Sequence, residues 1–423
     1  MSIRGSLALV PVAVIGAGAA GLMAAIFAAS RGSRVLLLER TRDGGHKILI
    51  SGGGRCNILP STIAPERFVS NAETALLRRM LRSWPLEGQR RFFEQEAGLP
   101  LVLEPKTGKW FPASNSARQV RDGLLKLAES RGVETRFESR VTAIERAPIA
   151  NAWRLRFHEG EPVDARAVII ASGGLSVPST GSDGMGLAWA RQLGHRVHTT
   201  YPALTPLTQS PPSHAALAGV SLEVTLTAAA GGPKPLRSLG GFLFTHRGYS
   251  GPALLNISHL AVQSVETGGP LQPIAVQWCR LDAPAWDRLL QQGRGPVSAV
   301  LRQELPARLA EALLDECAIG PQQSAAQLER AARQRLTRML SNYPLPWNGH
   351  EGYRKAEVTG GGVALDELDP LSFESRRHRG LFLCGEMLDA FGPIGGYNFL
   401  WAWVTGRAAG LGSAERARGL QAS

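Results

Sequence analysis

Hydrophobic and polar positions follow two different patterns along this chain of 423 residues. In the first pattern, a short apolar run leads through glycine into an alanine-rich segment with helical periodicity. Val12–Ile15, Ala19–Ser30 and Val35–Leu38 occur in this order, which predicts a strand, a helix and a second buried strand. Ala167–Ala171 and Leu381–Cys384 are further short apolar runs that end beside glycine, as is typical of buried parallel strands. Both ends of the chain therefore favour an α/β fold.

The middle of the chain has a different character. From His195 to Leu255, strand-like pieces such as Val220–Thr227 alternate with Pro and Gly, which is typical of an antiparallel or barrel-like domain. From Ala283 to Leu340 the pattern is helical and rich in Ala, Leu, Gln and Arg. The simplest division is a nucleotide-binding domain of residues 1–194 and 356–423 with an insert at 195–355, β-rich and barrel-like at 195–280 and 341–355 and helical at 281–340.

A dinucleotide-binding fingerprint lies between the first predicted strand and helix. The stretch GAGAAG at residues 16–21 matches GxGxxG, and Glu39 ends the second predicted strand. Gly16 allows the tight turn, Gly18 lets the backbone approach a pyrophosphate, and Gly21 lets the helix pack on the sheet. The helix N-terminus offers N–H groups and the positive end of its dipole to phosphates. Glu39 is expected to accept a hydrogen bond from a ribose hydroxyl.

The fingerprint alone does not separate NAD from FAD, but three features favour FAD. Ser51–Asn57 (SGGGRCN) is a second glycine loop that brings N–H groups, a cation and an amide toward a diphosphate or an isoalloxazine edge. Ala171–Gly174 is a glycine turn after a strand. Gly395–Asn398 precede a predicted helix at Trp401–Leu411, whose N-terminus suits negative charge on a reduced flavin. No second GxGxxG is present, which argues against a dedicated NADPH domain but leaves NAD(P)H open as a transient electron donor.

Four long stretches carry a more specific resemblance. They are SGGGRCN at Ser51–Asn57, FTHRGYSGP at Phe244–Pro252, EVTGGGV at Glu357–Val363 and GLFLCGEMLDAFGPIGGYNFLWAW at Gly380–Trp403. In these stretches the chain resembles the YhiN/BaiN-like family of FAD-dependent oxidoreductases, also described as the aminoacetone oxidase family. The resemblance implies a Rossmann-type, glutathione-reductase-like FAD domain formed by both chain ends, with an inserted barrel-like part and a smaller helical part. The chain departs from the family pattern at Ile58–Ser61, where the family commonly has polar residues.

The resemblance also implies cofactor contacts. Glu39 and Arg40 would meet the adenosine ribose, the backbone of Val141 the adenine, and Glu386 the ribityl or pyrophosphate region. Gly395 to Asn398 would meet the flavin ring. The full set of predicted cofactor-binding residues is Gly16, Gly18, Ala19, Ala20, Gly21, Glu39, Arg40, Lys47, Ser51, Gly52, Gly53, Arg55, Cys56, Asn57, Val141, Ala171, Ser172, Gly173, Gly385, Glu386, Gly395, Gly396, Tyr397 and Asn398.

Three residues are candidates for catalysis, and each has a structural alternative. Cys56 has no resolving partner nearby in the sequence, which favours packing or a place beside the flavin over a redox thiol. Tyr397 suits proton donation as well as support of the helix start. His246 suits a general acid on a loop that closes over the flavin, but the nearby Gly and Pro equally favour plain turn chemistry.

Charge and cysteine content limit the partners. Lys and Arg outnumber Asp and Glu by 47 to 35, and the net charge of +12 raises nucleic acid as a partner. The basic residues are dispersed, however, with modest clusters at Arg330–Arg338 and Arg376–Arg379, so we expect none. The cysteines form no CxxC pair, which indicates no metal site and favours the cytoplasm. Leu7–Ala29 is nearly uncharged, but its glycines argue against a signal peptide or a membrane segment.

We therefore predict an FAD-dependent oxidoreductase that transfers a hydride between flavin N5 and a small organic substrate. An NAD(P)H-linked reductase and an amine oxidase that uses oxygen both stay open, as do the substrate and the oligomeric state. A flavin-dependent RNA-modifying enzyme is an alternative from another class. A non-catalytic flavoprotein that binds a partner is a third.

Overall fold

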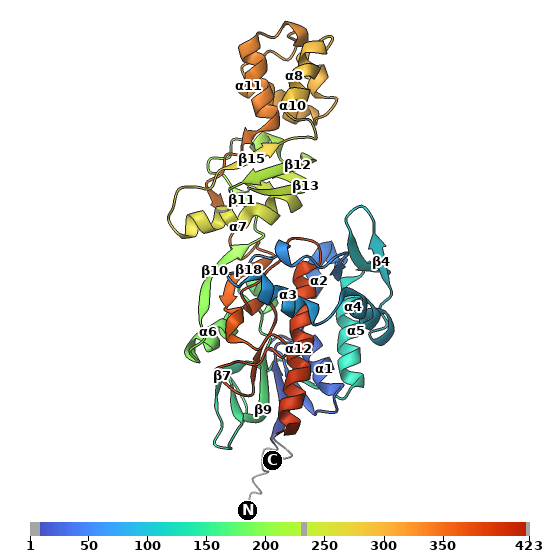
Figure 1. The fold of residues 1–423 in the computed structure, drawn as a ribbon, viewed down its shortest axis with the longest axis vertical. Coiled ribbons are helices and arrows are strands. Elements are labelled where there is room, and N and C mark those ends of the chain that lie inside the picture. Colours follow the sequence, from blue (N-terminus) through green and yellow to red (C-terminus); the bar gives the residue numbers. More distant parts are fainter. Residues whose placement is uncertain (1–8, 230–234, 420–423) are drawn as a thin grey trace, which may run out of the picture. The chain divides into compact units, whose positions relative to one another are not determined.

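The computed structural model describes residues 9–229 and 235–419, which divide into two compact units (Figure 1). The first unit comprises the described residues up to Thr200 and from Val358 onward, and the second comprises Tyr201–Glu357. We predicted an insert at 195–355, and its status as a separate domain stays a prediction. The strand β10, Val197–Ala203, contains the boundary between Thr200 and Tyr201, and it pairs with β18, Val358–Val363.

A seven-stranded sheet forms the centre of the first unit. Its order is β6-β2-β1-β9-β8-β7, and β19 pairs with the end of β9. The strands β6, β2, β1, β9 and β19 are parallel, whereas β7 and β8 form antiparallel pairs. The bounds are β1 Val10–Ile15, β2 Val35–Leu38, β6 Glu134–Arg136, β7 Val141–Arg146, β8 Trp153–Phe157, β9 Val163–Ile170 and β19 Leu381–Leu383. The predicted parallel α/β arrangement is confirmed.

Helices and a small antiparallel sheet, β3-β5-β4, surround this centre. The glycine loop that we predicted at Ser51–Asn57 begins with a 3-10 turn at Ser51–Gly54. The one-turn helix α2 precedes it, and buried Ile48 anchors this helix in the core. The bounds are α1 Ala19–Ala29, α2 His46–Ile50, β3 Leu59–Pro60, α3 Thr74–Arg82, α4 Leu86–Arg91, β4 Leu101–Glu104, β5 Lys109–Pro112, α5 Ala117–Ser130, α6 Met185–Gln192 and α12 Tyr397–Gly419.

The C-terminal helix α12 packs directly on α1, and the two helices lie side by side in Figure 1. Two glycines of α12 make this approach possible. A Cβ atom on Gly406 would overlap the carbonyl oxygen of Ala20, and one on Gly410 would overlap that of Ala24. Residues four apart lie on one face of a helix, so both glycines face α1. The contact joins the two ends of the chain beside the fingerprint turn.

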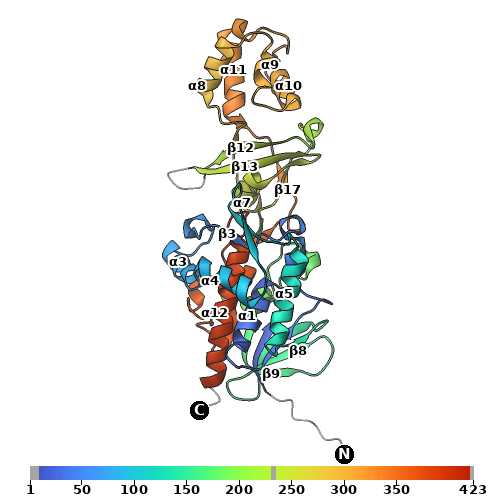
Figure 2. The ribbon, with the colours of Figure 1, turned by 90° about the vertical axis from the view of Figure 1, so that its right-hand side faces the viewer.

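The second unit combines an antiparallel sheet with a cluster of helices, which Figure 2 shows as separate layers. The sheet order is β16-β15-β12-β13-β14-β11-β17. The bounds are β11 Leu207–Thr208, β12 Ser221–Ala228, β13 Leu236–Thr245, β14 Gly248–Ser250, α7 Pro252–Glu266, β15 Ile274–Gln277, α8 Ala283–Gln292, α9 Val297–Leu301, α10 Ala307–Glu316, α11 Arg330–Ser341, β16 Tyr343–Pro344 and β17 Gly349–His350.

One prediction for this unit was wrong. We expected strand-like pieces up to Leu255 and a loop at Phe244–Pro252, but β13 and β14 form a hairpin there and α7 begins at Pro252. Proline is well accepted in the first turn of a helix, and the Ala and Leu residues that follow favour helix. Within residues 9–229 and 235–419, none of the helices combines the length and the apolar character that a membrane crossing requires.

The contact between α1 and α12 predicts that alanine substitutions at two glycines of α12 have very different effects on the stability of the protein. Gly410→Ala should lower the free energy of unfolding by about 1–3 kcal/mol, because the new methyl group forces the helices apart. Gly419→Ala is the matched control, because a Cβ atom there meets nothing within 4 Å. Chemical denaturation followed by circular dichroism measures both. Equal effects of the two substitutions would contradict the assigned contact.

Candidate dinucleotide site

The fingerprint turn is fixed by the packing of two glycines. Gly16 has φ = 103°, and its N–H group donates to the carbonyl oxygen of Leu38 at 2.7 Å. A Cβ atom on Gly16 would lie 2.6 Å from the carbonyl oxygen of Ala171, and one on Gly21 would overlap the carbonyl oxygen of Gly16. Both positions therefore require glycine for the protein's own packing.

Gly18 is different, because the protein itself leaves room for a side chain there. Its φ of −79° is available to any residue, and a Cβ atom would meet nothing within 4 Å. The first intrahelical bond of α1 runs from Leu22 N–H to Gly18 O at 2.9 Å, so the N–H groups of Ala19 and Ala20 precede the ladder. These N–H groups have no acceptor among residues 9–229 and 235–419, and open space beside such groups at a helix N-terminus fits the pyrophosphate of a dinucleotide.

Glu39 holds the turn from the next strand. Its side chain is buried and accepts hydrogen bonds from Ala17 N–H at 2.7 Å and from both the N–H and the hydroxyl of Thr41 at 2.8 Å. Each carboxylate oxygen can accept a further bond, so a ribose contact stays a prediction. Arg40 forms an ion pair with Asp183, which turns its cation toward the protein's own carboxylate.

A polar network joins α2 to three other segments of the first unit. Lys47 donates to the hydroxyl of Ser176 at 2.6 Å and forms an ion pair with Glu386. The Ser176 hydroxyl donates to Glu386 Oε1 at 2.5 Å, and Thr359 donates to the same oxygen through its N–H at 3.1 Å and its hydroxyl at 3.0 Å. Thr359 Oγ1 in turn accepts from Leu175 N–H at 2.7 Å. The structure thus brings the predicted residues Lys47 and Glu386 together.

This network lies next to the fingerprint helix. Glu386 follows Gly385, and a Cβ atom on Gly385 would lie 2.8 Å from Cβ of Ala20 in the first turn of α1. Sequence reasoning missed Ser176 and Thr359. The one available signal was the stretch at Glu357–Val363, which contains Thr359 but gave it no role.

The SGGGRCN stretch places its cation and its thiol in protein surroundings. Arg55 lies 4.0 Å over the ring of Phe111 and pairs with Glu104 at 3.0 Å. Cys56 is buried, and burial raises the pKa of its thiol to about 12, so the thiol stays protonated at neutral pH. The burial of Cys56 favours packing, one of the two roles that we preferred over a redox thiol, and a place beside the flavin stays a prediction. Contacts of Ser51, Gly52, Gly53 and Asn57 with a cofactor stay predictions.

The start of α12 is closely packed against β3 and β5. A Cβ atom on Gly396 would lie 2.6 Å from the carbonyl carbon of Leu59, and one on Gly395 would lie 3.0 Å from Cε of Lys109. Asn398 forms two hydrogen bonds with the preceding loop. Its side-chain amide donates to Gly392 O at 3.0 Å and accepts from Gly392 N–H at 2.9 Å. The helix start is therefore held rigidly.

Tyr397, the first residue of α12, has a largely structural environment. Its side chain is buried, its ring packs against Phe68, and its hydroxyl accepts from Arg67 Nη1 at 2.8 Å. This environment favours the helix-supporting alternative. A role in proton donation stays a prediction.

Lys109 was not singled out by the sequence. Its side chain is half-buried beside Gly395, and burial lowers the pKa of its ammonium group. Within residues 9–229 and 235–419 this ammonium has no hydrogen bond or ion pair to a side chain. A cation and a helix N-terminus that lie side by side repel each other, so this point of the structure is suited to an anionic group.

The remaining predicted residues lie outside the fingerprint turn and the start of α12. Ala171 donates its N–H to Ile15 O at 2.9 Å, which ties β9 to β1. Ser172 directs its hydroxyl toward α6, because a Cβ atom on Gly186 would overlap it. Val141 begins β7 and is buried. His246 is exposed in the turn between β13 and β14 of the second unit, and its approach to a flavin stays a prediction.

Comparison with known proteins identifies what this chain is similar to. Residues 10–412 match the family described as HI0933-like protein Rossmann domain. The ribosomal RNA dihydrouridine synthase of Escherichia coli is 34% identical over 401 residues, which cover 92% of this chain and 94% of that protein. The 3-dehydro-bile acid delta(4,6)-reductase of Clostridium scindens is 31% identical over 412 residues, which cover 96% and 99%.

The fold has solved counterparts as well. The 3-ketosteroid-delta4-(5alpha)-dehydrogenase of Rhodococcus jostii RHA1, solved with 4-androstene-3,17-dione, aligns with a TM-score of 0.51 over 97% of this chain and 98% of that one. At 15% identity this likeness concerns the fold alone. Together with the family match, it confirms the predicted Rossmann-type fold.

The open space at Gly18 predicts a selective loss of cofactor. Gly18→Val should fold normally and yet lose FAD, because its side chain would occupy the place of the pyrophosphate. Gly320→Val is the matched control, since a Cβ atom there also meets nothing within 4 Å. Flavin absorbance per protein and the melting temperature of the FAD-free protein are the measurements. Full flavin occupancy in Gly18→Val would contradict the assignment.

Proposed function

The chain belongs to the HI0933-like family of Rossmann-domain FAD-dependent oxidoreductases, and from that premise we propose that it reduces a carbon–carbon double bond conjugated with a carbonyl group. FAD is the cofactor and NAD(P)H the transient electron donor in this proposal. The observation that carries it is a chemistry shared by two relatives whose substrates are otherwise unlike.

The names of these relatives describe one reaction type. A dihydrouridine synthase adds two hydrogens across a double bond of the uracil ring, which is conjugated with a ring carbonyl. A 3-dehydro-bile acid delta(4,6)-reductase acts on double bonds conjugated with a 3-oxo group. Both relatives align with more than nine-tenths of this chain. A common site for conjugated double bonds is the simplest account of both similarities.

The reaction balances as a two-electron reduction. NAD(P)H gives up a hydride and becomes NAD(P)⁺, the hydride ends on the carbon β to the carbonyl group, and a proton is added to the α carbon. When bound, FAD supplies the N5 atom that accepts and donates hydride. The carbonyl group draws electron density away from the double bond, which makes the β carbon the favourable target for hydride.

In this proposal the chain's own residues hold and polarise the cofactor. The turn at Gly16–Gly21 and the N-terminus of α1 would bind the pyrophosphate. The pair of Lys47 and Glu386 would fix the segment that follows β19 against α1. Lys109 and the N-terminus of α12 would face the part of the flavin that gains negative charge on reduction. The cytoplasm, where NAD(P)H is available, is the compartment that suits this activity.

Anaerobic titration tests the proposal directly. NADH or NADPH should bleach the flavin absorbance of the FAD-loaded protein, and a conjugated enone such as 4-androstene-3,17-dione or an in vitro transcribed ribosomal RNA should restore it. Mass spectrometry should then show two added hydrogens in the acceptor. Flavin bands that neither donor bleaches would contradict the reductase, and bleaching by an amine with recovery on admission of oxygen would favour the amine oxidase instead.

A substitution at Lys109 tests whether this cation stabilises the negative charge of the reduced flavin. Lys109→Met should slow the reduction of the flavin by NAD(P)H by roughly tenfold, which corresponds to about 1.4 kcal/mol of lost stabilisation. Lys126→Met, which removes an exposed charge from α5, is the control and should react like the wild type. Stopped-flow absorbance at saturating donor gives the rate. Equal rates for the two variants would remove Lys109 from the site.

A further inference from the structure

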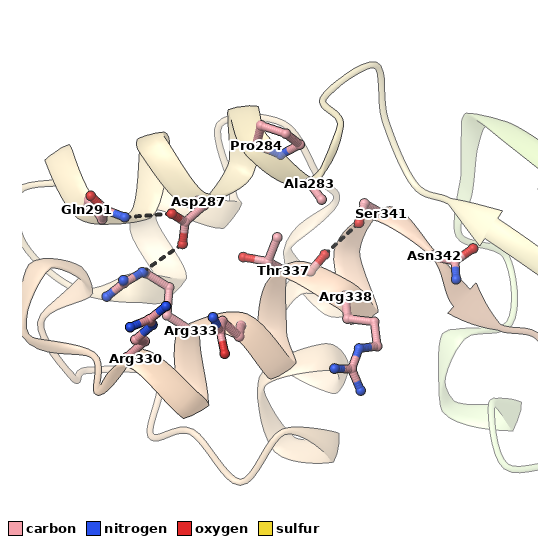
Figure 3. A pocket seen from close by; sticks show the side chains of 11 residues that line it. Ala283, Pro284, Asp287, Gln291, Arg330, Arg333, Thr337, Arg338, Ser341 and Asn342 are labelled. Atoms are coloured by element: carbon pink, nitrogen blue, oxygen red, sulfur yellow. Dashed lines mark hydrogen bonds and ion pairs between the residues drawn. The ribbon is translucent and has the colours of Figure 1, made fainter.

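A depression of about 890 Å³ lies between α8 and α11 in the second unit (Figure 3). Its lining contains three arginines but only one acid. The lining residues are Ala283, Pro284, Asp287, Gln291, Arg330, Arg333, Gln334, Thr337, Arg338, Ser341 and Asn342. No step of the proposed reduction uses this surface, so its composition needs a separate explanation.

Two of the arginines present unengaged cations. Arg330, Gln334 and Arg338 follow one another at a spacing of four residues, which places them on one face of α11. All three side chains are exposed. Among residues 9–229 and 235–419, the guanidinium groups of Arg330 and Arg338 have no hydrogen-bond or ion-pair partner. Their donors are therefore free to bind an anion.

Asp287, the acidic residue of the lining, is neutralised by an arginine of the same lining. Asp287 accepts from Arg333 Nε at 2.8 Å and from the Gln291 amide at 2.6 Å, and Figure 3 shows both contacts. Arg333 also donates to Leu328 O at 3.3 Å, so it is held in place. With Asp287 paired to Arg333, the remaining charge of the lining comes from Arg330 and Arg338.

Thr337 points to a ligand independently of the arginines. Its side chain lines the depression and is only 7% exposed, yet within the described part of the chain its hydroxyl has no hydrogen-bond partner. A buried polar group without a partner costs about 1–3 kcal/mol. An oxygen of a bound anion would satisfy this hydroxyl.

We propose that this depression, the α8–α11 site, binds phosphate groups of an RNA strand. Guanidinium groups match phosphate oxygens in a planar, bidentate geometry. The amides of Gln291, Gln334 and Asn342 supply donors and acceptors for ribose and base edges. Every lining residue except Ala283 and Pro284 has a polar side chain, which supplies the hydrogen-bonding groups that a polyanion needs.

The inference rests on the proposed function, because a uracil ring within RNA is one of the conjugated substrates considered there. It selects RNA as the substrate class and revises our expectation, drawn from the modest size of the cluster at Arg330–Arg338, that nucleic acid is not a partner. Phosphate contacts position a nucleic acid without reading its sequence, so the α8–α11 site would hold an RNA strand whatever its sequence.

Fluorescence anisotropy with a labelled oligouridylate tests the α8–α11 site on the FAD-loaded full chain. The double variant Arg330→Glu/Arg338→Glu should bind at least roughly tenfold more weakly than the wild type, and its salt dependence should lose about one unit of slope per phosphate contact. Arg118→Glu/Lys126→Glu changes the net charge equally on exposed positions of α5 and should bind like the wild type. Arg330→Gln/Arg338→Gln repeats the test without charge reversal.

The outcomes separate this inference from the proposed function. Equal binding by wild type and both arginine variants would overturn it, as would the absence of RNA binding by the wild type. Full competition by inorganic phosphate at matched phosphate concentration would also overturn it, in favour of a small-anion site. Bleaching of the wild-type flavin by NAD(P)H and reduction of an enone are measured in parallel. Their failure would count against the proposed function and not against RNA binding.

Discussion

The close contact between α1 and α12 is the constraint on which the first unit depends. Gly406 and Gly410 let the last helix touch the backbone of the first, so residues nearly four hundred positions apart in sequence share one packing surface. The same approach brings Gly385 against Ala20 at the start of α1. A larger residue at either glycine would separate these segments and the polar groups that they carry. The proposed cofactor site thus depends on a helix–helix contact as well as on the fingerprint turn.

The electrostatics of the two proposed sites differ. At the proposed cofactor site, the cation of Lys47 is paired with Glu386 and that of Arg40 with Asp183, so the positive charge left for a cofactor comes from helix N-termini and Lys109. In the second unit, Arg330 and Arg338 present open donors on one face of α11. Neutral, preorganised surroundings suit a tightly held cofactor, whereas open arginines suit a ligand that binds and leaves. This difference is what we expect if one unit holds the cofactor and the other holds a substrate.

The sequence predicted the features that depend on local pattern. The turn at Gly16–Gly21, the strands beside it and the change of character in the middle of the chain all follow from periodicity and glycine placement. The sequence could not predict that Ser176 and Thr359 meet Glu386, because these contacts join segments that come together only through the sheet. Arg55 belongs to the SGGGRCN motif, but its pairing with Glu104 arises from the β4–β5 hairpin, which the motif does not reveal. Lys109 belongs to no motif at all.

Both ends of the chain form a single FAD site in the function that we propose. Hydrogen exchange of the first unit, measured with and without FAD, tests this site most directly. We expect FAD to slow exchange together at residues 16–22, at residues 173–176 and at residues 385–398. Protection confined to the N-terminal fingerprint, with unchanged exchange at residues 385–398, would contradict it.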